Sequence, residues 1–157
     1  MSDDGQAAGV YALESAYLDR FVQVGYASGR VLSVSFPATP DEHGTEHPLL
    51  DRIEAYLEGQ RKTFEDVDVA LSAAVPTEQR DVLVEVREIP YGQQVSVERL
   101  ARTTPGLDPD DADDLQLVRT ALAENPAPLV VPDHRIRDGP SAAPPEIEQR
   151  LRSLEGL

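Results

Sequence analysis

The chain of 157 residues contains no cysteine and no tryptophan, and it has a single methionine. Without a thiol it has no disulfide, no thiolate nucleophile and no zinc site built from cysteine ligands. Long apolar runs are also missing, since none approaches the roughly 20 residues that a membrane-spanning helix needs. The sequence therefore excludes thiol chemistry, and we expect a protein that does not cross a membrane.

Positive charge is scarce. Lysine and arginine together number 14 against 29 aspartates and glutamates, the net charge is −15, and Lys62 is the only lysine. Such self-repulsion destabilises a compact chain at low salt, whereas at molar salt the Debye length falls to about 3 Å. We interpret the composition as that of a halophilic protein from a salt-rich cytoplasm. An acidic protein without this adaptation is the alternative.

The charge also bears on location and partners. Residues 1–4 are acidic rather than basic and do not resemble a signal peptide, so we expect a cytoplasmic protein. Neutralising phosphates supplies most non-specific affinity for nucleic acids, and this chain has the wrong overall sign for it. Any DNA binding would need a local basic surface.

Hydrophobic periodicity predicts a small sheet followed by a helix in the first half of the chain. The expected elements are a frayed terminus over 1–9, a β-hairpin over 21–36, a helix over 48–58 and an extended segment over 64–71. Val75-Pro76 is typical of a linker. Residues 10–74 are therefore expected to form an N-terminal lobe of a sheet plus a helix.

The second half is predicted to be helical. The expected helices span 77–88, 95–103, 110–123 and 146–154, and residues 129–131 form a short buried segment. Thr77 and Ser96 are the expected caps of the first two helices. The middle two helices flank a turn with Pro105 and Gly106, a weak match to a helix-turn-helix. Residues 75–157 would thus form a winged helix-turn-helix lobe, and the fold class is α/β (α+β).

Several short motifs resemble those of one family in order and spacing. The chain reads Pro132-Asp133-His134-Arg135-Ile136 where the O6-alkylguanine-DNA alkyltransferases (methylated-DNA–protein-cysteine methyltransferases) have Pro-Cys-His-Arg and then Val or Ile. Residues 89–97 resemble the family's Ile-Pro-Tyr-Gly and Val-Ser-Tyr motifs, and residues 121–126 its Ala-Leu-x-x-Asn-Pro motif. Leu154-Glu155-Gly156 resembles its closing Leu-Glu-Gly, and residues 47–50 its N-terminal lobe. The resemblance spans nearly the whole chain and implies the two-lobed fold of that family.

The resemblance also implies a mechanism for active members. They flip the alkylated guanine out of the duplex, and an arginine of the recognition helix fills the gap. Their cysteine, activated through water, a histidine and a glutamate, takes the alkyl group in one stoichiometric transfer.

This chain departs from the family pattern at the positions that react with or handle the base. The substitutions are Asp133 for the cysteine, Val97 for the tyrosine, Gln116 for the intercalating arginine, Gly139-Pro140-Ser141 for a Gly-Gly-Tyr loop and Glu148 for a lysine. The retained scaffold residues are Asn125, His134, Arg135 and Glu155. Because the thiol is absent, we predict that the chain is not an enzyme.

Asp133 has three possible interpretations. It fills the emptied nucleophile position as a relic, or it lines a pocket that recognises an alkylated base without reacting. Alkyltransferase-like proteins of the second kind typically carry tryptophan there. In the third, the carboxylate itself accepts the alkyl group, although a carboxylate is a much poorer nucleophile than a thiolate. His134 beside Glu155 is either an acid–base pair or a buried hydrogen bond that holds the loop, and we favour the second.

Candidate DNA contacts follow from the same alignment of motifs. They are Ser96, Val97, Gln116, Arg119, Asp133 and Arg135. A local basic face could comprise Arg99, Arg102, Arg119, Arg135 and Arg137. Against it stand Asp108, Asp110, Asp111, Asp113 and Asp114, at the helix end that usually approaches a phosphate. Convergence of Arg99, Arg119 and Arg135 on one surface would favour DNA binding, and aspartates covering that surface would favour a scaffold.

A metal site is the last candidate. His43 and His47 lie near Asp41, Glu42 and Glu46, but the glycine and proline beside them favour a solvated loop. We expect no metal and no cofactor.

The sequence therefore predicts a monomeric, non-catalytic alkyltransferase-like protein that binds double-stranded DNA and recognises O6-alkylguanine damage for DNA repair. Repair proteins are the expected further partners. The alternative is a diverged scaffold without DNA binding that acts through protein contacts. Dealkylation by Asp133 is the least favoured interpretation.

Overall fold

The structure, a computed structural model, describes residues 8–41, 43–60 and 63–157. This part of the chain forms three β-strands, six α-helices and a short 3-10 helix, an α+β fold that confirms the predicted fold class. Most of the segment predicted to be frayed, residues 1–9, lies outside the described residues. Its last residue, Gly9, opens a strand, which corrects the predicted boundary.

One antiparallel sheet has the order β1 (Gly9–Ser15), β2 (Arg20–Ala27), β3 (Arg30–Ser35). The predicted hairpin is confirmed: β2 pairs with β3, and Ser28 and Gly29 turn the chain with φ of 56° and 77°. Strand β1 was not predicted. Its buried positions include the small residues Ala12 and Ser15, so the strong apolar alternation of the other strands is missing.

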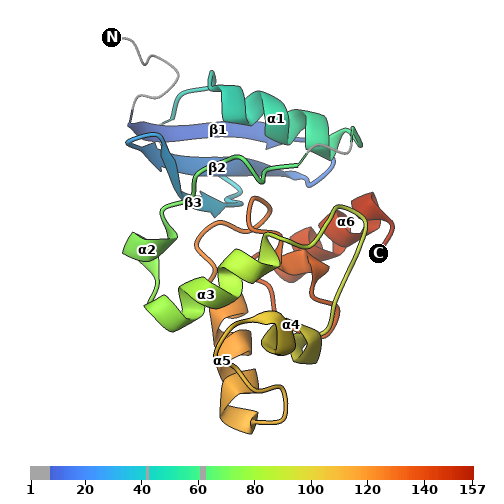
Figure 1. Ribbon diagram of the computed structural model, residues 1–157. Helices are drawn as coiled ribbons and strands as arrows, with labels where there is room; N and C mark the ends of the chain where they lie inside the picture. Colours follow the sequence, from blue (N-terminus) through green and yellow to red (C-terminus); the bar gives the residue numbers. More distant parts are fainter. Residues whose placement is uncertain (1–7, 42, 61–62) are drawn as a thin grey trace.

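Helix α1 (Pro48–Leu57) confirms the predicted helix and runs alongside β1 (Figure 1). His47 precedes it and caps it, because the His47 Nδ1 accepts a hydrogen bond of 3.1 Å from the Leu49 N–H. The ring is buried, with its centroid 4.7 Å from that of Tyr11 and 4.4 Å from that of Tyr26, and burial lowers its pKa. His43 instead contacts the Asp41 carbonyl at 2.7 Å, so the two histidines have separate structural partners.

The segment predicted to be extended makes only one isolated bridge, in which Val31 pairs with Val69. Arg87 holds it from the other side by donating hydrogen bonds to the carbonyls of Phe64 and Val67, at 2.7 Å and 2.6 Å. Helix α2 (Leu71–Ala74) follows and was not predicted. It occupies a single turn, too short for a periodic pattern to identify.

The second half of the chain is helical. Its elements are α3 (Thr77–Val86), α4 (Val97–Thr103), α5 (Ala112–Ala123), the 3-10 helix η2 (Asp133–Arg135) and α6 (Pro145–Glu155). Helices α3 and α4 both pack against α5, and α6 packs against η2. Ser96 caps α4 as predicted, with its hydroxyl accepting from the Arg99 N–H at 3.0 Å. Thr77 is not a cap: Pro76 takes that position, and Thr77 is the first helical residue.

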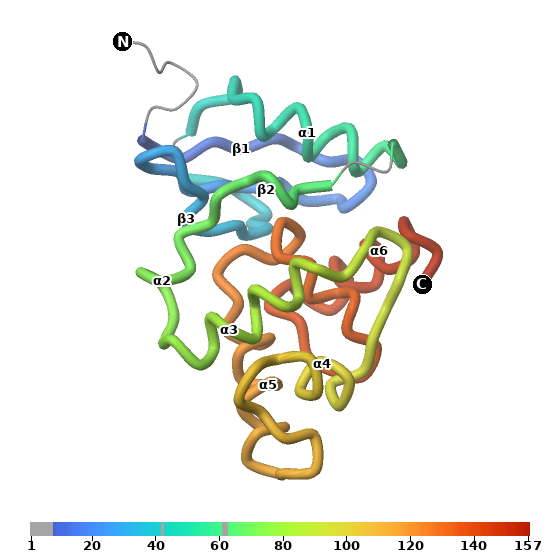
Figure 2. The backbone as a smooth tube through the Cα atoms, in the orientation of Figure 1, coloured from blue at the N-terminus to red at the C-terminus, as the bar shows by residue number. Residues whose placement is uncertain are grey.

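The backbone trace in Figure 2 shows the loop before η2 approaching the sheet from the helical half. There the Val34 N–H of the edge strand β3 donates a hydrogen bond of 2.9 Å to the Pro126 carbonyl. This contact fixes the loop that carries Asp133 against the N-terminal half. Within the described ranges, no helix is long and apolar enough to span a membrane.

Candidate functional site

Asn125 shapes the loop that leads to Asp133. Its side-chain Nδ2 donates to the Val131 carbonyl and to the Asp133 Oδ2, both at 3.0 Å, and its Oδ1 accepts from the Ala127 N–H at 3.0 Å. The intervening Leu129 is buried with a φ of 81°, a value that non-glycine residues rarely adopt. Asn125 therefore holds the ends of this loop together through its side chain.

Asp133 is fully buried, with an exposed fraction of 0%. Its Oδ1 accepts a hydrogen bond of 2.6 Å from the Ser141 hydroxyl, and its Oδ2 accepts from Asn125 and from the Ala142 N–H at 2.9 Å. Burial raises the pKa of Asp133, and the hydrogen bonds from Ser141, Ala142 and Asn125 only partly oppose this rise. Both carboxyl oxygens are thus occupied by the protein's own donors.

His134 and Glu155 form the buried pair that the sequence predicts. The His134 Nε2 lies 2.8 Å from the Glu155 Oε2, and both side chains are fully buried. Since an ionised carboxylate only accepts, Nε2 carries the proton of this hydrogen bond. The other ring nitrogen, Nδ1, is buried and has no hydrogen-bond partner among the described residues.

Tyr56 joins this pair from the other half of the molecule. Its hydroxyl donates to the Glu155 Oε2 at 2.5 Å and lies 3.3 Å from the His134 Nε2. Burial, and then the charge of Glu155, raise the pKa of Tyr56 well above its ordinary value, so the hydroxyl keeps its proton. Helix α1 is thereby tied to the end of α6.

Arg135 points inward as well. Its Nε and Nη2 donate to the two oxygens of Glu155 at 2.9 Å and 3.0 Å, and its Nη1 donates to the Ile89 carbonyl at 2.7 Å. Its guanidinium lies 5.7 Å from the Tyr91 ring centroid. The Gly92 N–H adds a further hydrogen bond of 3.0 Å to the Glu155 Oε1. The Ile-Pro-Tyr-Gly motif therefore supplies a carbonyl, a ring and an N–H to one buried cluster.

Glu155 is the centre of this cluster. Burial acts to raise its pKa, but the hydrogen bonds from His134 and Arg135, the charge of His134 and the Gly92 N–H together hold the pKa well below its ordinary value. Glu155 is therefore ionised and balanced by the Arg135 guanidinium at close range.

The structure separates the residues that the sequence grouped as DNA contacts. Arg135 is 7% exposed and Val97 is 1% exposed, so neither these two residues nor the buried Asp133 is supported as a DNA contact. Gln116 and Arg119 do lie exposed on α5. Ser96 is half-buried, and its hydroxyl is engaged as the cap of α4. Arg99, Arg102 and Arg137 are exposed, whereas Arg135 turns inward to Glu155 and so does not belong to the predicted basic face.

The aspartates at the start of α5 are occupied with the backbone. Asp111 accepts from the N–H groups of Asp113 and Asp114 at 2.8 Å and 3.4 Å, and Asp114 accepts from the Asp108 N–H at 2.9 Å. These carboxylates satisfy the positive end of the helix dipole, which is where a phosphate would otherwise bind. Figure 1 shows this end of α5 at the tip of the molecule, far from the sheet.

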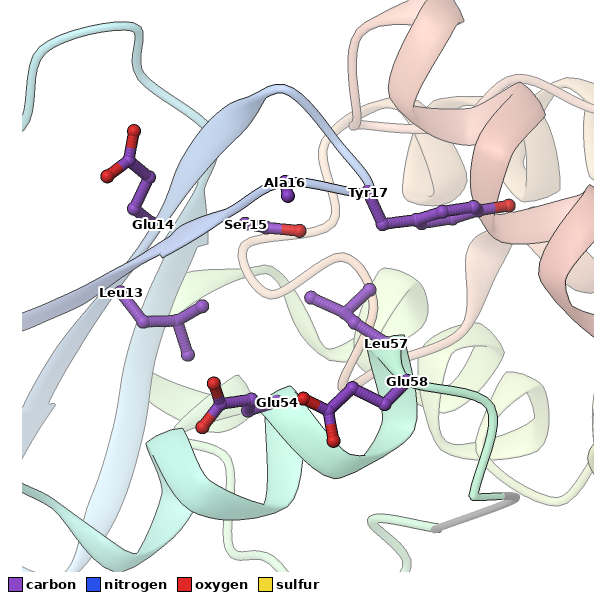
Figure 3. A pocket seen from close by; sticks show the side chains of 8 residues that line it. All are labelled: Leu13, Glu14, Ser15, Ala16, Tyr17, Glu54, Leu57 and Glu58. Atoms are coloured by element: carbon purple, nitrogen blue, oxygen red, sulfur yellow. The ribbon is translucent and has the colours of Figure 1, made fainter.

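A hollow of about 230 Å³ lies between β1 and α1 (Figure 3). Its rim carries Glu14, Glu54 and Glu58, and its wall includes Leu13 and Leu57. None of the residues around Asp133 or Glu155 lines it, so it is separate from the candidate site.

Comparisons with known proteins identify relatives of this chain in sequence and in fold. The profile of a family described as "6-O-methylguanine DNA methyltransferase, DNA binding domain" matches residues 77–153. A methylated-DNA–protein-cysteine methyltransferase of Methanopyrus kandleri is 34% identical over 134 residues, which cover 80% of this chain and 93% of that protein.

Solved structures share the fold. The Mycobacterium tuberculosis O6-methylguanine methyltransferase superimposes with a TM-score of 0.71 at 19% identity, covering 94% of this chain and 90% of that chain. The OGT of the same organism in complex with DNA superimposes with a TM-score of 0.68 at 19% identity, over 92% and 89% of the two chains. At this identity the likeness shows the fold alone.

Proposed function

This chain belongs to the family of methylated-DNA–protein-cysteine methyltransferases, and we propose that it is a non-catalytic, alkyltransferase-like member that binds double-stranded DNA and recognises O6-alkylguanine for repair. One observation carries the proposal: the position of the family's cysteine holds the fully buried Asp133, whose carboxyl accepts three hydrogen bonds from the protein itself. The fold is kept while the reactive group is replaced.

Alkyl transfer to Asp133 is disfavoured by its surroundings. A nucleophilic carboxylate must be ionised and must have a lone pair directed at the substrate. Burial favours the neutral form of Asp133, and Ser141, Asn125 and Ala142 occupy its oxygens. We therefore propose recognition without chemistry.

DNA binding is supported by the domain match and by the exposed side chains of α4 and α5. Arg99 and Arg102 are exposed on α4, and Gln116 and Arg119 on α5. Arginines that contact phosphates position a protein on a duplex, and Gln116 takes the place of the residue that fills the gap left by a flipped base. The net charge of −15 opposes approach to DNA unless salt screens it, so we propose that the protein works in a salt-rich cytoplasm.

A scaffold that binds proteins rather than DNA is the second candidate function. The aspartates that cap α5 favour it, because they place negative charge beside the helix that would enter the groove.

Fluorescence anisotropy of a labelled duplex, with and without one O6-methylguanine, tests the proposal. The titrations would run from about 0.1 M to about 3 M KCl, a range in which the Debye length falls from about 10 Å to below 3 Å. We expect tighter binding of the lesion duplex. Arg119→Ala should weaken binding to both duplexes by a similar factor, as the loss of a phosphate contact does. Arg30→Ala, an exposed arginine in the β2–β3 hairpin, should leave both affinities unchanged.

Absence of binding at every salt concentration would refute DNA recognition and leave the scaffold. Mass spectrometry of the protein after incubation with the lesion duplex tests the remaining alternative, alkyl transfer to Asp133. A methyl ester on Asp133, or turnover of the lesion, would show that the chain is an enzyme after all.

A further inference from the structure

The junction of β3, α2 and α3 gathers positive charge on an acidic molecule. A hollow of about 370 Å³ there is lined by Arg30, Arg80 and Arg87. Asp68 is the one acidic residue among the described residues that line it. The chain has a net charge of −15 and 14 basic residues, so the charge of the residues that line this hollow is opposite in sign to the net charge of the protein. We call it the arginine hollow.

Two features leave the guanidinium groups available for a ligand. Arg87 is half-buried, and its Nη2 is fixed by the carbonyls of Phe64 and Val67 at 2.7 Å and 2.6 Å. These hydrogen-bond partners are neutral carbonyls that orient the group, while its charge is met at longer range by the carboxylates of Asp68, Glu88, Asp66 and Glu65. Across the residues that the structure describes, the side chains of Arg30 and Arg80 make no hydrogen bond or ion pair. A guanidinium has five N–H donors in a fork that matches a carboxylate. In Arg30 and Arg80 these donors have no acceptor among the described residues.

The hollow also has an apolar component. Arg80, Val84 and Arg87 follow one another at the spacing of a single helix face along α3. Val84 is 44% exposed, although it is a large apolar residue. Leu32, also 44% exposed, is two residues from Arg30 on β3 and therefore shares its face of the strand. Arginine is enriched at protein–protein interfaces, and covering an exposed aliphatic side chain is favourable, whereas interfaces with nucleic acids are more polar.

The surfaces around the arginine hollow limit where an acidic partner can bind. The hollow in Figure 3 presents Glu14, Glu54 and Glu58, which repel an acidic segment. Figure 1 places α2 and the β3 edge on the side of the molecule away from α4. A partner at the arginine hollow therefore would not need to displace a ligand bound at the exposed face of α4.

We propose that the arginine hollow is a docking site for an acidic segment of a partner protein. Carboxylates of that segment pair with Arg30 and Arg80, the fixed guanidinium of Arg87 lies at the base, and an apolar side chain of the segment packs on Val84. The proposal does not rest on DNA binding, because none of these residues belongs to α4 or α5.

The test uses the full chain and a fluorescein-labelled peptide of glutamates around a central leucine, at about 0.15 M salt where charge pairs are only partly screened. We expect saturable binding that Arg80→Gln weakens roughly tenfold, as the loss of one charge-assisted pair does. Val84→Ser should weaken binding several-fold. Arg119→Gln is the matched control: it removes the same charge from α5 and should leave peptide binding unchanged, while Arg80→Gln should leave DNA binding unchanged.

Arg80 is chosen because its side chain has no partner that the fold needs, and circular dichroism would check that the variant folds. Three outcomes would overturn the proposal. The first is that the peptide does not bind. The second is that Arg80→Gln and Arg119→Gln weaken peptide binding equally, which would indicate general charge attraction. The third is that inorganic phosphate or a duplex displaces the peptide through Arg80 as effectively as unlabelled peptide does, which would indicate a site for phosphates.

Discussion

Asp133 and His134 are neighbours on one 3-10 turn and are both fully buried, but they belong to two polar clusters with different partners. The Asp133 cluster comprises Asp133, Asn125, Ser141 and Ala142, all from one stretch of the C-terminal half. The Glu155 clamp comprises Tyr56, Gly92, His134, Arg135 and Glu155, and it joins α1, the loop after α3, η2 and the end of α6.

The two clusters differ in how charge is balanced. Glu155 accepts hydrogen bonds from a guanidinium, an imidazole, a hydroxyl and a backbone N–H, and its pKa is held low. Asp133 has only neutral donors, and its pKa is raised by burial. The ionised carboxylate is thus favoured at Glu155 in the clamp and disfavoured at Asp133, the residue next to His134 of the clamp.

Three of the retained family residues, His134, Arg135 and Glu155, lie in the clamp, and the fourth, Asn125, lies in the Asp133 cluster. The clamp ties the two halves of the molecule together whether or not a thiol stands at position 133. Its stabilising role does not depend on catalysis, so His134 and Glu155 remain useful to the fold after the nucleophile is lost. The same geometry that would orient a catalytic histidine also holds the η2 turn in place.

The largest expected effect comes from breaking the clamp at its centre. Glu155→Gln leaves the buried Arg135 guanidinium without a counter-charge, and removing one partner of a buried pair costs about 3–5 kcal/mol. Denaturant unfolding in concentrated KCl would measure the loss. Glu148→Gln is the control on the same helix: it pairs with Arg152 at a position 22% exposed, so we expect at most about 1 kcal/mol. Equal losses for the two variants would show that the clamp has no special structural role.

A smaller effect is expected in the Asp133 cluster. Ser141→Ala removes the hydrogen bond of 2.6 Å to the Asp133 Oδ1 and leaves a buried acceptor unsatisfied, which costs about 2 kcal/mol. The same unfolding experiment would measure it. Ser153→Ala, at an exposed position of α6, should change stability by less than about 0.5 kcal/mol. If Ser141→Ala matched this control, the Ser141 hydroxyl would contribute nothing to holding Asp133.

Local patterns predicted most of the fold, and the motif resemblance predicted one contact of the clamp. The hairpin, α1 and α5 have strong periodicity or turn signals, and the His134–Glu155 pair followed from the motif resemblance. Strand β1 lacked such a signal, because two of its buried positions hold the small residues Ala12 and Ser15.

The missed parts of the site depend on tertiary packing. Tyr56 contacts Glu155 across a separation of 99 residues, and no local pattern encodes how α1 docks on the helical half. Arg135 was expected among the DNA contacts from the motif resemblance, yet here a carboxylate and a carbonyl provide it with internal partners. A buried charge is recognisable only once its counter-charge is located.

The smallest effect, and the one that contrasts the two carboxyl groups most directly, is the pH dependence of Asp133→Asn. Asparagine matches the shape of aspartate: its oxygen accepts from Asn125 and Ala142, and its amide donates to the Ser141 hydroxyl. Since burial raises the folded-state pKa of Asp133, its carboxyl destabilises the fold increasingly as pH rises above the unfolded value of about 3.9, and contributes nothing below it. Glu155 has the opposite sign: its lowered pKa gives stability that is present above about pH 4.3 and is lost as pH falls.

Glu155 is the same in both proteins, so its contribution cancels when Asp133→Asn is compared with the natural chain. The stability difference should therefore be near zero at about pH 3.5, grow with rising pH in favour of the variant, and stay constant once the folded-state carboxyl is ionised. Unfolding curves across this pH range in concentrated KCl would measure it, and Asp81→Asn at an exposed position of α3 should show no such trend. A difference that grows as pH falls would mean that Asp133 is stabilised as an anion, and the carboxylate would then have to be reconsidered as a reactive group.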